Sequence, residues 1–128
     1  MKNEKLVDKI RQLCTDISTA QHEAFPSLSK YRTVTFEPGR KYCKIILQDS
    51  FNVEAGGQIG ESVWGFINLK EFVKERKMTN NVKTVTFKEG DVLMANGWSA
   101  PALNSARGNL LDGYAVGGRN QHGPSYLT

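Results

Sequence analysis

Residues 5–24, KLVDKIRQLCTDISTAQHEA, carry the clearest periodic pattern of apolar residues in this sequence. The apolar positions recur at alternating steps of four and three, and Val7 and Cys14 widen the stripe. The repeating residues are Leu6, Ile10, Leu13, Ile17, Ala20 and Ala24. This spacing predicts an amphipathic α-helix that ends at Pro26. The narrow stripe fits a helix on a sheet of its own chain, and it also fits a helix against a second copy. We expect the intramolecular packing, because small domains cover their own sheet first.

Three runs rich in β-branched and aromatic residues follow the helix. Residues 32–36 (RTVTF) and 41–47 (KYCKIIL) are joined by a Pro-Gly turn and predict a β-hairpin. Residues 62–69 (SVWGFINL) are apolar at successive positions, which predicts a central strand covered on both faces. A regular pleat would place Trp64 and Phe66 on the same face of that strand.

Between and after these runs the pattern is weaker. Residues 50–61 are glycine-rich and predict a loop, residues 70–77 predict a short helical or irregular segment, and residues 82–87 predict a return to the sheet. We therefore predict a single α+β domain over residues 1–128. It would have an N-terminal amphipathic helix packed on an antiparallel β-sheet, a short C-terminal helix and a flexible tail.

The charge of the chain allows a polyanionic partner without requiring one. The formal net charge is +4 and the isoelectric point is about 9.1. Cationic residues gather in one place, and only Glu71 and Glu75 oppose them there. These cations are Lys70, Lys74, Arg76, Lys77 and Lys83. The patch fits a solvated surface, and it also fits a nucleic-acid surface.

The two cysteines predict neither a disulfide nor a zinc site. Cys14 lies in the helical pattern and Cys43 in a strand pattern, and the chain has no CxxC pair. We expect both to be buried small hydrophobic residues in a reducing cytoplasm. The N-terminal residues lack the apolar core of a signal peptide, and no run of about 18 apolar residues occurs. We expect a cytoplasmic protein with no membrane association and no cofactor.

The segment 90–113, GDVLMANGWSAPALNSARGNLLDG, concentrates the unusual chemistry of the chain. Ser99 is a candidate N-cap, and the apolar spacing after it predicts a helix that closes near Asp112. Trp98 offers a flat ring beside this helix start, and Arg107 offers a planar donor of charged hydrogen bonds. These are the parts of a site for an anionic aromatic ligand. The alternative is that Trp98 is a core residue beside a capped helix.

The tail after residue 113 is rich in glycine and has little periodic pattern. It has two interpretations. In the first it is an irregular segment at the end of the chain with no binding role. In the second it folds over a pocket as a lid, in which Arg119 would meet a phosphate and Tyr126 a base.

The sequence predicts no enzyme. Catalysis by a nucleophile needs an adjacent base, and the histidines are His22, on the polar side of the helix, and His122, in the tail. Asp91 and Asp112 are each explained by a turn. The chain has no P-loop, HExxH or GxSxG motif.

Residues 87–113, with RKYCKI at 40–45 and SVWGFI at 62–67, resemble small bacteriophage proteins, the Thoeris anti-defence sponges of the first type. The resemblance implies a phage protein that forms a symmetric homo-oligomer in the host cytoplasm. Such a protein sequesters a cyclic ADP-ribose signal made by a host TIR-domain enzyme, without cleaving it. In some members the same assembly also holds cyclic trinucleotides at a separate site.

The resemblance also implies roles for individual residues. Trp98 would stack on the base, Asn109 would make a polar contact, and Arg107 or Arg119 would pair with phosphate. Trp98 is larger than the aromatic residue that the family pattern leads us to expect. The lid interpretation of the tail adds Tyr126 to this ligand-binding set. A homo-oligomer is also predicted from the residues, because a small domain with a narrow helical stripe would otherwise have to cover its apolar sheet alone.

Two other classes of protein stay open. One is a small single-stranded nucleic-acid-binding phage protein, in which the cations of residues 70–83 follow the backbone and Tyr31, Tyr42 or Trp64 stack on bases. The other is a structural phage protein without a ligand, in which Trp98 belongs to the core. Backbone binding would weaken steeply with salt, whereas a closed pocket around one small ligand would respond modestly.

Overall fold

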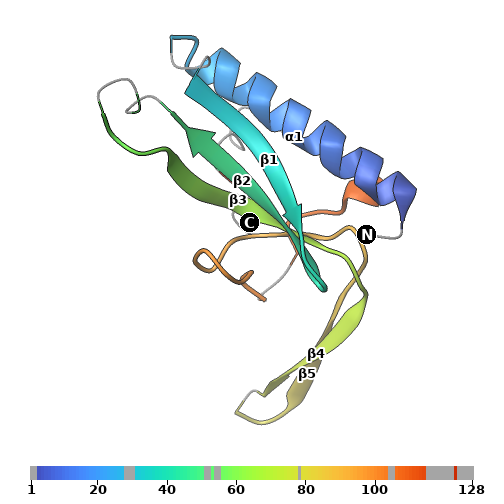
Figure 1. Cartoon of the computed structure of the whole chain (residues 1–128). Helices are drawn as coiled ribbons and strands as arrows, with labels where there is room; N and C mark the ends of the chain where they lie inside the picture. The colour runs from blue at the N-terminus through green and yellow to red at the C-terminus, as the bar shows by residue number, and fades with distance from the viewer. Residues whose placement is uncertain are drawn as a thin grey trace.

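The computed structural model describes residues 3–27, 31–50, 53, 56–77, 79–103, 106–114 and 123. Its elements, in chain order, are α1 (Glu4–Ala24), β1 (Arg32–Pro38), β2 (Tyr42–Asp49), β3 (Gly60–Asn68), β4 (Phe72–Lys77), β5 (Val82–Phe87), β6 (Val92–Leu93) and the 3-10 turn η3 (Leu110–Asp112). Figure 1 shows α1 lying along the main sheet, while β4 and β5 form a hairpin that extends away from the rest of the chain. The predicted α+β fold is confirmed.

The main sheet contains four antiparallel strands in the order β1-β2-β3-β6. β1 and β2 form the predicted hairpin, in which Phe36 lies opposite Ile45. β3 lies between β2 and β6, so its predicted central position is confirmed. One face of this sheet carries α1, and we refer to the opposite face as the far face.

The first helix forms where the apolar stripe predicted it. Its N-cap is Asn3, whose side-chain oxygen accepts a hydrogen bond from the Leu6 N–H at 3.2 Å. The predicted stripe is buried against the chain's own sheet as far as Ile17. Beyond that point Ala24 is exposed and Gln21 is buried. Gln21 tolerates burial because its side-chain oxygen accepts a hydrogen bond from Arg32 Nη1 at 2.7 Å.

A β-bulge in β3 changes which residues share a face. The register between β2 and β3 shifts between Ile45 and Ile46, which leaves Trp64 as an extra residue in β3. Trp64 consequently packs with α1, whereas Phe66 belongs to a second cluster on the far face. The prediction that these two aromatic residues share a face is wrong, because the bulge interrupts the two-residue alternation of the pleat.

The predicted helical or irregular segment at residues 70–77 is instead the strand β4. It pairs with β5 in a separate two-stranded sheet, so residues 82–87 do not return to the main sheet as predicted. Phe72 stacks on Phe87 with ring centroids 5.1 Å apart, and this pair joins the hairpin to the far-face cluster. The partner strand and this contact, rather than local propensity, decide the conformation.

The helix predicted from Ser99 is absent from the described residues 99–103 and 106–109. Residues 94–102 form a loop instead, which we call the Trp98 loop. The Ala102 N–H donates to the Met94 carbonyl at 2.7 Å, and the Asn96 N–H donates to the Ala100 carbonyl at 2.9 Å. These two bonds close the loop and leave Trp98 near its tip.

After the loop the chain returns beside β6. The Arg107 N–H donates to the Val92 carbonyl at 2.7 Å, and the Val92 N–H donates to the Gly108 carbonyl at 2.8 Å. This pairing satisfies the free edge of β6, and it uses backbone groups that a helix would pair within itself. Gly108 has φ +150°, and a Cβ there would lie 2.4 Å from a ring carbon of Tyr114. The predicted C-terminal helix is therefore reduced to the short turn η3.

The described residues include little of the predicted tail. Tyr114 is partly buried and packs edge to face on Trp64, with ring centroids 6.4 Å apart. Arg119, His122 and Tyr126 lie outside the described residues. The lid interpretation of the tail stays a prediction. Among the helices of the described chain, none is both long and apolar enough to cross a bilayer.

Both cysteines are buried and free, as predicted. Burial raises the pKa of the Cys14 thiol to about 11 and that of the Cys43 thiol to about 12. We expect neither to react with iodoacetamide at pH 8 in the folded protein, since the thiolate is the nucleophile. Both folded pKa values exceed the value of about 8.5 in the unfolded chain, so the unfolded chain loses its thiol protons first as the pH rises. The stability that depends on the protonated thiols is therefore complete below about pH 8.5. It is lost as the pH rises towards 11 to 12.

Mass spectrometry of protein treated with iodoacetamide, with and without guanidinium chloride, checks the expected protection of the two cysteines. Two modifications in denaturant and none in buffer is the expected result. Modification of the folded protein as fast as of the unfolded chain would contradict it.

Candidate functional site

The Trp98 loop presents a large aromatic ring to solvent. Gly97 precedes the tryptophan with φ +86°, a left-handed conformation that glycine adopts without strain and that turns the chain sharply. The Trp98 side chain is 46% exposed. The interpretation of Trp98 as a core residue is therefore wrong. The buried tryptophan is Trp64, at 1% exposure.

A cation lies over the ring of Trp98. Lys44 lies between the buried Cys43 and Ile45 on β2, so the alternation of the strand directs it to the far face. Its Nζ is 4.2 Å from the centroid of the Trp98 ring, within the range of a cation–π interaction. Sequence reasoning missed Lys44. The alternation of KYCKIIL contained a usable signal, since it placed one charged residue between two buried ones.

Arg107 lies at the base of the same loop. Its Nη2 is 3.8 Å from the sulfur of Met94, the residue at which the Trp98 loop begins. The side chain is partly buried, and its backbone is held beside β6. The structure thus brings Arg107 to the loop that carries Trp98, although the cation in contact with the ring is Lys44.

Asn109 uses its side chain inside the chain. Its Nδ2 donates to the Glu89 carbonyl and to Asp91 Oδ1, both at 2.9 Å, and its Oδ1 accepts from the Leu111 N–H at 2.8 Å. The residue caps η3 and forms a β-bridge with Asp91. These three bonds hold the segment that carries Arg107, and a ligand would have to compete with them.

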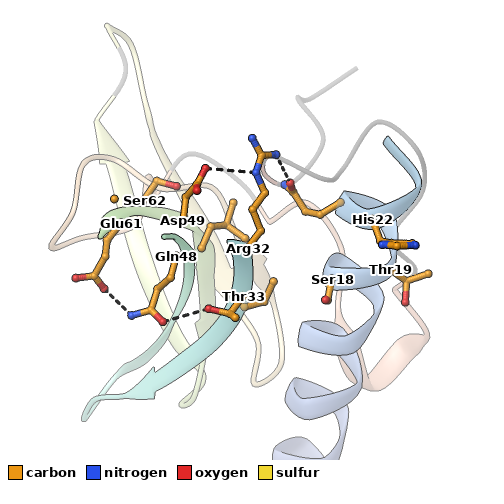
Figure 2. A pocket seen from close by; sticks show the side chains of 13 residues that line it. Ser18, Thr19, His22, Arg32, Thr33, Gln48, Asp49, Glu61 and Ser62 are labelled. Carbon is orange, nitrogen blue, oxygen red and sulfur yellow. Dashed lines mark hydrogen bonds and ion pairs between the residues drawn. The ribbon is translucent and has the colours of Figure 1, made fainter. Parts of the chain in front are cut away.

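A cavity of about 590 Å³ opens elsewhere, between the C-terminal half of α1 and the adjoining ends of β1, β2 and β3. Figure 2 shows Ser18 and His22 on the helix across from Arg32 and Gln48 on the strands. The apolar part of the lining comes from Val34 and Leu47. Residues from four elements build this cavity, which sequence reasoning did not anticipate.

The polar groups of the cavity are largely paired with one another. Arg32 Nε lies 3.5 Å from Asp49 Oδ2, and Gln48 Nε2 donates to Glu61 Oε2 at 3.2 Å (Figure 2). The lining thus contains one arginine and two carboxylates. This balance of charges is unfavourable for binding a dianionic diphosphate, whatever the size of the cavity. Among the predicted site residues that the structure describes, none lines this cavity.

The residues weighed for catalysis are dispersed. His22 is exposed on α1. Asp91 is buried, with Oδ2 accepting from the Lys88 N–H at 2.7 Å, whereas Asp112 is exposed. The turn interpretation of Asp91 is confirmed. Within the described part of the chain, no group of three or more His, Cys, Asp and Glu side chains is arranged to hold a metal ion.

Comparison with family models, with curated proteins and with solved structures finds no match to this chain.

Proposed function

We propose that this protein is a non-catalytic binding protein that sequesters a cyclic ADP-ribose-type nucleotide, the function that its resemblance to the phage Thoeris anti-defence sponges implies. The supporting observation is the exposed Trp98 ring with the Lys44 ammonium 4.2 Å from its centroid. A purine needs a flat apolar face and a diphosphate needs cations. This pair offers both on one surface.

In this proposal each residue has a stated role. The base stacks on Trp98, and Lys44 and Arg107 pair with the phosphates. Asn109 acts indirectly, because its hydrogen bonds hold the backbone next to Arg107. Arg119 would supply a further cation from the tail, and Tyr126 a further ring.

The proposal requires no cofactor and no bond cleavage. It places the protein in the cytoplasm of the host cell, where the signal is made. It also includes assembly into a homo-oligomer, which would let the exposed Trp98 surface be closed by a second copy.

Replacing the ring tests the proposal. Trp98→Ala is expected to weaken binding of cyclic ADP-ribose isomers by about 5- to 150-fold, because stacking contributes about 1 to 3 kcal/mol per base. Trp98→Phe keeps a smaller ring and is the matched control, which should retain most of the affinity. Titration calorimetry gives the affinities, and native mass spectrometry of protein from signal-producing cells gives the ligand mass and the number of subunits together.

Arg107→Ala tests the phosphate contact of the proposed pocket separately from the stacking on Trp98. Loss of a charge-assisted hydrogen bond of about 1.5 to 3 kcal/mol should weaken binding by roughly tenfold or more. An Arg107→Ala protein that binds as tightly as the parent would show that the phosphates lie elsewhere. If Trp98→Ala also binds as tightly, the proposed site is wrong.

A further inference from the structure

We infer that the β4–β5 hairpin is an arm that docks on the phosphodiester backbone of a nucleic acid, at a surface separate from the Trp98 loop. The first observation is the distribution of charge. Residues 70–88 contain six lysines and arginines and two acidic residues, which leaves 11 of each sign in the rest of the chain. The net charge of +4 is thus located in this one segment.

The strand register places cations together on one face of the hairpin. Phe72 and Phe87 lie opposite each other and share a face with Lys74, while Glu75 points to the other face. Lys83 lies on the same face as Lys74, two residue pairs nearer the tip. The face therefore begins at the aromatic pair that packs on the far-face cluster, and it becomes cationic towards the end of the hairpin.

This charge arrangement opposes the stability of the hairpin. Lys74 and Lys83 are diagonal neighbours on this face, so two positive charges lie close together. Like charges at neighbouring cross-strand positions destabilise a strand pair. Lys74, Lys77 and Lys83 are exposed and form no ion pair within the described residues. An anionic partner would neutralise these cations, and the relief of their repulsion would favour binding.

The shape of the hairpin fits the same partner. Its two strands extend away from the main sheet (Figure 1), and its contacts with the far-face cluster come from Phe72, Val85 and Phe87. A two-stranded ribbon is narrow enough to enter the major groove of a duplex or to lie along a single strand. Six residues per strand give a contact length of about 20 Å.

The opposite face of the hairpin fits a second copy of the chain poorly. Val73 and Val82 are 60% and 56% exposed there. They lie near opposite ends of the hairpin, with the polar pair Glu75 and Thr84 between them. The two valines therefore form no continuous apolar patch that another subunit could cover.

The test compares two double variants with the same change in net charge. Lys74→Gln/Lys83→Gln removes two charges from the cationic face, and Lys5→Gln/Lys9→Gln removes two exposed charges from α1. Fluorescence anisotropy with labelled single-stranded and duplex DNA measures binding at 50 and 200 mM salt. With about three phosphate contacts, we expect the affinity of the parent over this range to fall about 40-fold for duplex DNA and about 18-fold for single-stranded DNA.

The hairpin variant is expected to bind at least 10-fold more weakly than the parent at 50 mM salt, while the α1 variant stays within about twofold. The salt dependence should also become shallower in the hairpin variant alone. Comparison of the affinities for single-stranded and duplex DNA shows which form of phosphodiester backbone the hairpin prefers. An equal loss in both variants, or binding to phosphatidylserine vesicles without binding to DNA, would overturn the inference. Nucleotide binding at Trp98 is measured separately and does not bear on this result.

Discussion

Trp64→Ala is expected to lower the free energy of unfolding by about 3 to 5 kcal/mol, whereas Trp98→Ala should change it by about 1 kcal/mol or less. Trp64 is 1% exposed and packs against α1 in the larger core cluster, so its removal leaves a cavity. Trp98 is 46% exposed, and the Lys44 ammonium lies over its ring. The two substitutions delete the same side chain from opposite environments.

Thermal and guanidinium unfolding of both variants measure this difference. The melting temperature should fall by about 10 to 20 °C for Trp64→Ala and by only a few degrees for Trp98→Ala. A large loss of stability in Trp98→Ala would mean that the ring is buried, in this chain or against a second copy. Measurement over a range of protein concentrations separates those two cases.

Asn109→Ala is expected to cost about 2 to 3 kcal/mol of stability, because it removes three hydrogen bonds at once. The Glu89 carbonyl, Asp91 Oδ1 and the Leu111 N–H would each lose a partner. Asp91 is itself buried and holds the turn through the Lys88 N–H. The loss should therefore loosen both the turn before β6 and the start of η3.

Asn96→Ala is the matched control, since Asn96 is exposed in the Trp98 loop and should tolerate the change within about 0.5 kcal/mol. Denaturant unfolding gives both values. An Asn109→Ala protein with the stability of the parent but with weakened nucleotide binding would contradict the structural role. Asn109 would then contact the ligand directly, as the resemblance implies.

Several features of this protein follow from local sequence pattern alone. The stripe from Leu6 to Ile17 predicted α1 and its buried face, because the period of a helix is set by neighbouring turns of one segment. The β1–β2 hairpin and the burial of Cys14 and Cys43 also followed from alternation and composition. In each case the physical cause acts over a few residues.

Other features depended on contacts between segments that are distant in sequence. Trp64 faces α1 because β2 and β3 shift register, and β4 is a strand because β5 pairs with it. Residues 106–109 do not form the predicted helix because the edge of β6 offers hydrogen bonds that a helix could not satisfy. In the last two cases the local propensity allowed more than one conformation.

The candidate site divides in the same way. The sequence singled out Trp98 and Arg107 by residue type, but not their surroundings. The tertiary structure alone brings Lys44 to the ring of Trp98 and uses Asn109 as a brace for the chain beside Arg107. Residue type and local period are properties of a segment, whereas side-chain partners depend on strand register and on the edge that a returning chain covers. Sequence pattern therefore determined the helix and the hairpin and singled out Trp98 and Arg107, and only the folded chain decided which residues are exposed and which residues meet.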